Sequence, residues 1–129
     1  MTLLWQAESV HFVDVPEWPA TAEEAVAVQE RLRKLVDLGD DCPELPPTVT
    51  GFDVAYDGDR VAAAAVTLGT SDFRIIEQQC VTEKAAFPYE PGLFAFRELP
   101  PLLAALNRMR GVPDVLVCDG HGLAHPRRF

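Results

Sequence analysis

The sequence predicts an α/β fold with a helix, a meander of three antiparallel strands, a second helix and a parallel fourth strand. Three observations lead to this order. A helix-start signal at Thr21 precedes apolar residues at helical spacing, apolar runs separated by turn residues begin at Val49, and a second helical stretch leads into Val115 to Cys118. At 129 residues the chain is long enough for one domain.

Residues 1–17 alternate apolar and polar side chains loosely, which leaves open whether they form a short strand or an ordered arm. Thr21 and Glu24 have the spacing of a capping box, in which each side chain bonds to the other residue's backbone amide. The helix that starts there is expected to reach about Leu38, because Gly39 ends it. Its apolar stripe consists of Ala25, Val28, Leu32, Leu35 and Val36.

The hydrophobic period changes after the acidic, proline-rich connector that follows this helix. Val49 to Tyr56 is expected to form a strand, and Asp57-Gly58 is a tight-turn signal. Arg60 to Leu68 is almost entirely apolar, which predicts a strand buried on both faces. Phe73 to Thr82 follows as a third strand, in which Ile75-Ile76 breaks the alternation and predicts a bulge. Strands joined by such short turns form an antiparallel meander.

The second helical region contains two adjacent prolines. Gly92 to Glu98 can form one or two turns, and we expect a separate helical piece to start at Pro100-Pro101, because proline is tolerated in a first turn but not in a helix interior. Val115 to Cys118 is then a short buried strand. A right-handed crossover places it parallel to and beside the first strand of the meander. This order is the first half of a ribonuclease H-like sheet.

The charge of the chain is strongly acidic but unevenly distributed. Of the net −9, residues 1–44 carry ten acids and three bases, whereas residues 97–129 carry three acids and five bases. The total argues against a nucleic-acid ligand, because phosphates are neutralised by clustered Lys and Arg, and only the C-terminal third is compatible with one. Three widely spaced cysteines and the absence of a signal-peptide pattern or long apolar run predict reduced thiols in a cytoplasmic protein.

Three carboxylates lie at positions where an unpaired charge is costly. Asp53 is inside the first strand of the meander, Glu98 closes an apolar helical stretch, and Asp119 follows the fourth strand. If the first and fourth strands are neighbours, Asp53 and Asp119 lie side by side, and the helix between them can bring Glu98 to the same place. Converging carboxylates favour a hard cation such as Mg²⁺, which can activate water for phosphoryl chemistry. Each acid taken alone is equally compatible with a solvated strand end or a helix cap.

Tyr89 lies between Pro88 and Glu90-Pro91 on a stiff loop. An aromatic side chain there could insert into a base stack, or it could cover the edge of the core; the sequence leaves both open.

The segment after Asp119 combines glycines, histidines and arginines. Gly120 and Gly122 allow close approach of the backbone to a ligand, and His121 and His125 could donate to phosphate or help activate water. Arg127 and Arg128 could pair with phosphates. We do not expect zinc, because a stretch with this glycine and proline content is not the helix that a zinc-binding histidine pair needs.

The same residues resemble the endonuclease V family of deoxyinosine-directed repair nucleases. Gly51 to Tyr56 is similar to the family's first metal-binding strand, and Phe87 to Glu98 is similar to its wedge loop and Phe-Arg-Glu motif. Asp119 to Phe129 is similar to its Asp-Gly-His-Gly segment. Trp18-Pro19 and the helix after it resemble the family's N-terminal helix, so the resemblance covers residues 18–129.

The resemblance implies a metal centre and a phosphate-binding side. Asp53, Glu98 and Asp119 would bind Mg²⁺, with Mn²⁺ as a substitute. His125 and Arg127 would support the phosphate side, and His125 would belong with the carboxylates to the catalytic set. Members of the family cut the second phosphodiester bond 3′ to the lesion, and some prefer inosine in RNA.

The resemblance also implies a site for the deaminated base. Tyr89 would be the wedge that separates the damaged base from its strand. The residues that would help to line the pocket for the flipped hypoxanthine are Gly92, Leu93, Gly122 and Leu123.

The chain departs from the family pattern in three places. Glu90 replaces an apolar residue after the wedge tyrosine, and Leu99-Pro100 replaces a Gly-Pro. The family also continues beyond the position of Phe129 with a last strand, flanking helices, a lysine at the scissile phosphate, a further metal-proximal residue and much of its basic surface. We therefore expect residues 18–129 to be the N-terminal half of such a domain, weakly active or inactive alone.

The alternative is a catalytically inactive remnant that acts as a self-associating or interaction domain. Without a fifth strand, the fourth strand would have an open edge beside uncovered apolar surface. On this basis we expect a homo-oligomer, with residues 115–118 near the contact.

Overall fold

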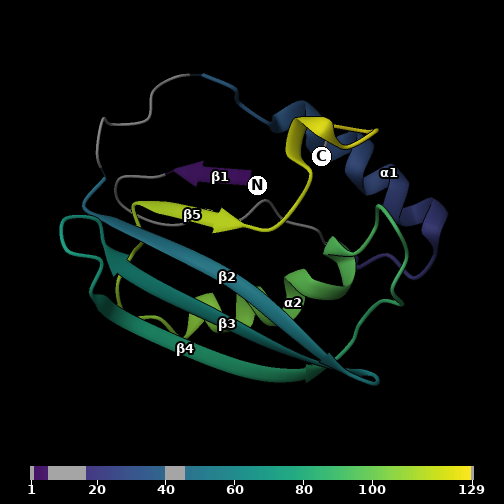
Figure 1. Ribbon diagram of the computed structural model, residues 1–129. Helices are drawn as coiled ribbons and strands as arrows, with labels where there is room; N and C mark the ends of the chain where they lie inside the picture. Colours follow the sequence, from purple (N-terminus) through teal and green to yellow (C-terminus); the bar gives the residue numbers. More distant parts are fainter. Residues whose placement is uncertain (1, 6–16, 40–45, 129) are drawn as a thin grey trace.

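The computed structural model describes residues 2–5, 17–39 and 46–128, which form a five-stranded sheet with helices against it (Figure 1). The strand order is β1-β5-β2-β3-β4. The strands are β1 (Thr2–Trp5), β2 (Thr48–Asp57), β3 (Arg60–Gly69), β4 (Ile75–Lys84) and β5 (Val115–Cys118). The helices are α1 (Ala22–Leu32), α2 (Ala95–Asn107) and the short 3₁₀ turns η1 (Arg33–Leu35) and η2 (Gly122–Ala124). Neither described α-helix is long and apolar enough to cross a membrane.

The capping box at the start of α1 is confirmed. The Thr21 hydroxyl accepts a hydrogen bond from the Glu24 amide at 3.2 Å, and the Glu24 carboxylate accepts one from the Thr21 amide at 3.4 Å. The predicted end of the helix is wrong, because the α-helix stops at Leu32 and a single 3₁₀ turn follows. Leu35 is 62% exposed, so the last part of the predicted apolar stripe gains no tertiary packing, which is what stabilises most short helices.

The meander and its bulge are confirmed. Strands β2, β3 and β4 pair antiparallel in sequence order. Thr67 lies opposite Glu77 while Leu68 lies opposite Ile75, so Ile76 is the extra residue of the bulge. Strand β5 lies parallel to β2, as the crossover rule predicts, with Val49 opposite Val115 and Gly51 opposite Val117.

Strand β1 occupies the edge that we expected to be open. Its residues pair antiparallel with β5, from Thr2 opposite Cys118 to Trp5 opposite Val115. The expected contact between chains through an open edge at residues 115–118 therefore loses its basis. The loose alternation of residues 1–17 does not distinguish a strand from an arm; residues 6–16 of that segment lie outside the described part.

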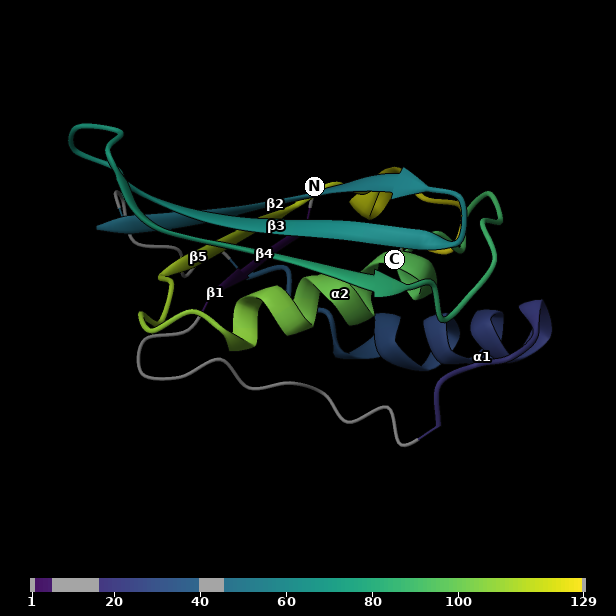
Figure 2. The same ribbon diagram turned by 90° about the horizontal axis from the view of Figure 1, so that it is seen from below.

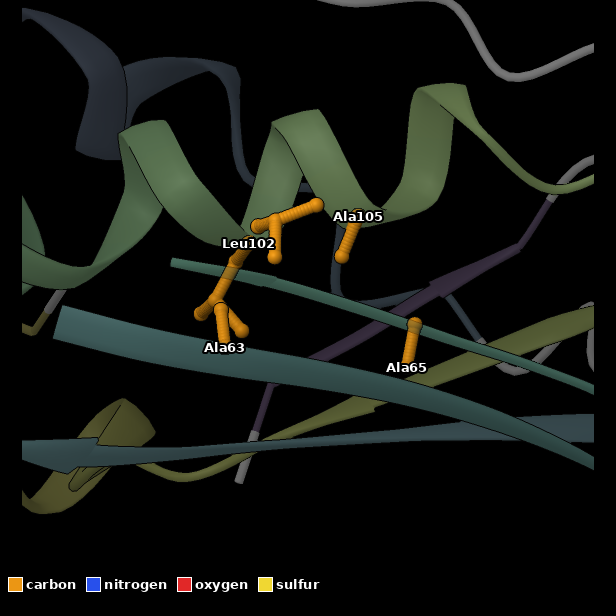
Figure 3. Close-up of a cluster of buried hydrophobic side chains, with 5 residues drawn as sticks. Ala63, Ala65, Leu102 and Ala105 are labelled. Carbon is orange, nitrogen blue, oxygen red and sulfur yellow. The ribbon is translucent and has the colours of Figure 1, made fainter. Parts of the chain in front are cut away.

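Both helices lie on the same side of the sheet (Figure 2), where α2 packs on the strands and Ala25 of α1 packs against Phe87, Leu93 and Phe96. The side chains of β3 that face α2, among them Val61, Ala63 and Ala65, are fully buried, whereas the alternate residues are only partly buried. The prediction that β3 is buried on both faces is wrong, because no helix in the described ranges covers its second face. Leu102 and Ala105 of α2 pack onto Ala63 and Ala65 (Figure 3).

Helix α2 runs without interruption through Pro100 and Pro101, so the expected break there is also wrong. Pro100 cannot donate a hydrogen bond to the carbonyl of Phe96, four residues earlier. The indole Nε1 of Trp18 donates to that carbonyl at 2.9 Å instead. A tertiary contact thus satisfies the backbone group that the proline leaves unpaired.

Truncation of Leu102 tests the interface between α2 and the sheet. Leu102 is 9% exposed, so Leu102→Ala leaves a cavity and is expected to lower the free energy of unfolding by about 2–4 kcal/mol. The matched control is Leu35→Ala, which removes the same atoms from a 62% exposed side chain and should change stability by less than about 0.5 kcal/mol. Urea unfolding measures both, and equal effects would contradict the packing described.

Candidate active site

The three predicted carboxylates come from three different elements. Asp53 lies on β2, Glu98 lies in α2, and Asp119 directly follows β5. Because Gly51 is opposite Val117 in the parallel pair, Asp53 and Asp119 each lie two residues beyond a paired position, at the same end of neighbouring strands. Asp53 and Asp119 are exposed, whereas Glu98 is partly buried.

The charges of Asp119 and Asp53 both act on Glu98. Burial raises the pKa of Glu98 above its ordinary value, a hydrogen bond from Tyr56 opposes that rise, and the charges of Asp119 and Asp53 add to it. A carboxylate whose pKa rises beside two others experiences like-charge repulsion, which a bound cation would relieve.

The donor chemistry at this place fits a hard divalent cation, because all three groups offer carboxylate oxygens. Among the described residues, however, no three acidic, histidine or cysteine side chains are grouped so that they could hold a metal ion. The Oε1 atom of Glu98 accepts a hydrogen bond from the Tyr56 hydroxyl, and Oδ1 of Asp53 accepts one from the Val54 amide at 2.9 Å. Binding of an ion by all three therefore requires these side chains to rearrange.

Tyr56 is a site residue that the sequence analysis missed. Its ring lies under the Arg97 guanidinium, with 4.9 Å from Cζ to the ring centroid, and meets the Tyr89 ring in a T-shaped contact at 6.3 Å. Burial, and next the hydrogen bond and charge of Glu98, raise the pKa of Tyr56 well above its ordinary value, so the hydroxyl remains a donor. The signal that could have identified Tyr56 is its position in the Gly51–Tyr56 segment, three residues after Asp53 on the same strand.

Arg97 joins the loop of residues 87–91 to the turn between β2 and β3. Its guanidinium donates to the carbonyl of Phe87 at 3.1 Å and to the carbonyl of Gly58 at 2.9 Å. Its buried Nε has no hydrogen-bond partner within the described structure. Tyr89, on this loop, is 61% exposed, which argues against the alternative that it covers the core edge.

The Gly92 carbonyl connects one predicted base-pocket residue to His125 and Arg127, which were predicted for the phosphate side, and to Gln29. The Gly92 carbonyl oxygen accepts hydrogen bonds from Gln29 Nε2 at 2.9 Å, His125 Nε2 at 3.1 Å and Arg127 Nη2 at 3.1 Å. Arg127 Nε also donates to Gln29 Oε1 at 2.6 Å. Gly92 has φ +79°, and a Cβ there would lie 3.3 Å from both His125 and Arg127, so this position requires glycine.

The ring of His125 is used structurally in this arrangement. It is 5% exposed; Nδ1 accepts from the Arg127 amide at 3.1 Å, so Nε2 carries the proton that it donates to Gly92. Both nitrogens are thus engaged, and neither is available to the phosphate or water that the sequence analysis assigned to them.

The remaining pocket residues differ in exposure. Leu93 is 4% exposed and packs in a cluster with Phe87, Phe96 and Ala25, whereas Leu123 of η2 is 59% exposed. Gly122 has φ +52°, a left-handed conformation. The Leu93 side chain is therefore part of the core, and only its backbone could face a ligand.

Gln29 is the second residue that the sequence analysis missed. It is 1% exposed on the buried face of α1, four residues after Ala25. A polar side chain on an otherwise apolar helical face was the available signal. Its carboxamide is the only side-chain contact described between α1 and both Gly92 and Arg127.

The family model for endonuclease V matches residues 30–129 of the chain. The curated endonuclease V of Streptomyces coelicolor is 51% identical over 123 residues, which are 91% of this chain and 52% of that protein. The chain thus spans about half the length of the curated relatives it matches.

Solved structures of endonuclease V are similar to this fold. The crystal structure from Streptomyces avermitilis matches with a TM-score of 0.81 at 50% identity, covering 87% of this chain and 50% of that one. The Ciona intestinalis protein, in complex with a 23mer DNA containing an inosine followed by a ribo-adenosine, matches with a TM-score of 0.73 at 28% identity, covering 84% and 50%. The predicted ribonuclease H-like fold class is confirmed by this similarity.

Replacement of Glu98 tests the cost of ionising this carboxyl, which comes first from burial and then from the charges of Asp119 and Asp53. Because folding raises the pKa of Glu98, its ionisation opposes folding, and stability falls as pH rises through its titration. Glu98→Gln keeps an acceptor for Tyr56 and removes the charge. Without metal at pH 7 it is expected to be more stable than wild type by up to about 1 kcal/mol, discounted for partial exposure.

Thermal melts at pH 7 and pH 4 measure this effect. The gain should shrink at the lower pH, where wild-type Glu98 takes up its proton. The exposed Glu83→Gln is the matched control and should show little change at either pH. A Glu98→Gln variant less stable than wild type at pH 7 would contradict this cost of ionising Glu98.

Replacement of Gln29 tests the hydrogen bonds around Gly92. Gln29→Leu keeps the approximate size but leaves Arg127 Nε without its acceptor, so we expect a loss of about 1–3 kcal/mol in unfolding free energy. Gln78→Leu is the control, because Gln78 is exposed on β4. Guanidinium unfolding measures both, and similar small losses would show that the buried carboxamide is dispensable.

Proposed function

The chain belongs to the endonuclease V family, and on that premise we propose that it carries a metal-dependent nuclease site that hydrolyses a phosphodiester bond near deoxyinosine in DNA. The observation that carries the proposal is that Asp53 and Asp119 lie at the same end of neighbouring strands and that their charges act on Glu98 of α2. We take residues 18–129 as the counterpart of the N-terminal half of its relatives.

The proposed cofactor is Mg²⁺, with Mn²⁺ as a substitute, held by the carboxylates of Asp53, Glu98 and Asp119. When bound, such an ion polarises a phosphoryl oxygen and lowers the pKa of an attacking water. The chain would supply the three carboxylates from β2, α2 and the end of β5, and the Glu98 side chain would turn toward the other two when the ion binds.

The proposed base site lies between the wedge loop, residues 87–91, and the C-terminal segment, residues 119–128. Tyr89 is displayed on its loop as the wedge, and Gly92, Gly122 and Leu123 offer backbone and surface to a flipped hypoxanthine, with the backbone of Leu93. His125 and Arg127 act by fixing the Gly92 peptide. The Ciona intestinalis complex with inosine-containing DNA supports this assignment, and inosine-containing RNA is the alternative substrate to test.

We expect the activity of this chain by itself to be weak. The net charge of −9 disfavours phosphate binding, and the chain spans about half the length of its curated relatives. The cysteine pattern supports a cytoplasmic location.

The second candidate is a catalytically inactive domain that self-associates. It is favoured by a shallow apolar depression on the sheet face opposite α2. Residues that line it include Val49, Phe52, Ala64, Val66, Leu68 and Val117. Association of two copies would bury this face rather than the β5 edge, which β1 already covers.

Cleavage of a deoxyinosine-containing oligonucleotide tests the first proposal. With Mg²⁺ we expect slow nicking that chelation abolishes and that Asp53→Asn reduces at least about tenfold, because the substitution removes a ligand charge. The matched control is Asp72→Asn, an exposed aspartate of the β3–β4 turn, which should cleave like wild type.

Two outcomes separate the candidates. Nicking that is equal in wild type and Asp53→Asn would exclude this site as its source. No nicking, together with a dimer in sedimentation equilibrium that Val66→Glu dissociates, would favour the self-associating domain.

A further inference from the structure

We propose that Tyr56 is a positioning residue that holds Glu98 out of the metal centre, and that a divalent cation must displace the Tyr56 hydroxyl to acquire this ligand. The inference rests on the proposed function, because it concerns the same three carboxylates. In this inference the Tyr56 hydroxyl and the cation compete for the Glu98 carboxylate, and this competition sets the affinity for the ion.

The first support is the direction in which β2 presents its side chains. Asp53 and Tyr56 are three residues apart on one strand, so they leave it on opposite faces. The hydrogen bond from Tyr56 therefore holds Glu98 toward the face that Asp53 does not share. This agrees with the absence of a metal-holding group of three among the described side chains, although both aspartates act electrostatically on Glu98.

The second support is that the Tyr56 ring is itself fixed. Arg97 lies on one side of the ring and is bound to the carbonyls of Phe87 and Gly58, and the edge of the Tyr89 ring packs against it. Movement of the tyrosine would disturb these contacts. The exchange is therefore made by the flexible Glu98 side chain, which turns from the hydroxyl toward Asp53 and Asp119.

The exchange is energetically modest. Tyr56 is 43% exposed, so water can replace Glu98 as the acceptor of its hydroxyl proton. A hydrogen bond that water can replace is worth about 1 kcal/mol net, which corresponds to a factor of roughly five in affinity. Tyr56→Phe removes the competitor and keeps the ring, so we expect it to bind Mg²⁺ or Mn²⁺ about fivefold more tightly than wild type.

Calorimetric titration of the purified chain with Mn²⁺ tests the inference without any measurement of cleavage. The control is Thr82→Val, which removes a hydroxyl from an exposed side chain of β4 and should leave the Kd for Mn²⁺ within about twofold of wild type. Glu98→Gln should weaken binding at least about tenfold, because it removes a charged ligand. Circular dichroism confirms that each variant is folded.

A second measurement follows Tyr56 directly. The chain has two tyrosines, so ¹³C-tyrosine labelling gives signals from two rings, which the Tyr56→Phe spectrum assigns. We expect the Tyr56 signal to shift as Mg²⁺ saturates the wild-type chain, with the same Kd as the calorimetric titration with that ion.

The outcomes are distinguishable. Equal or weaker Mn²⁺ binding by Tyr56→Phe, with binding still dependent on Glu98, would overturn this inference and leave the proposed metal centre intact. Binding that Glu98→Gln does not affect would overturn it as well. No binding by the wild-type chain would overturn both this inference and the metal dependence of the proposed function.

Discussion

The close approach of α2 to β3 is the constraint on which the rest of the structure depends. Ala63, Ala65 and Ala105 are fully buried at this interface, and their small side chains let the helix lie directly on the sheet. The first turns of the same helix carry Arg97 and Glu98. Packing in the core therefore determines where Glu98 is placed, and also where Arg97, which binds the loop of residues 87–91, is placed.

Much of this fold could be predicted from the local sequence pattern, because the interactions that form these elements join residues close together in the sequence. The capping box at Thr21 and the bulge at Ile76 depend on residues adjacent in sequence. The uninterrupted course of α2 could not be predicted, since it depends on Trp18 reaching the Phe96 carbonyl from a distant part of the chain. The pairing of β1 with β5 likewise joins segments whose own patterns are weak.

In the candidate site, too, features of the local sequence could be predicted, whereas contacts between distant segments could not. The carboxylates could be identified because an acid within an apolar run is unusual, and the crossover rule brought two of their strands together. Gln29 and Tyr56 were missed because their importance lies in partners far along the chain, Gly92 and Glu98. For His125, residue type indicated proton chemistry, whereas the hydrogen bonds of its two nitrogens show a structural use.

The pairing of β1 with β5 also has a consequence for the order of folding. Thr2–Trp5 can pair with Val115–Cys118 only after the residues between them have been synthesised. The meander β2–β3–β4 has only neighbouring contacts and can form earlier. Asp119, directly after β5, thus joins Asp53 only after the meander can already have formed, and a partly folded chain would carry residues 87–91 before Asp119 reaches its place at the same sheet end as Asp53.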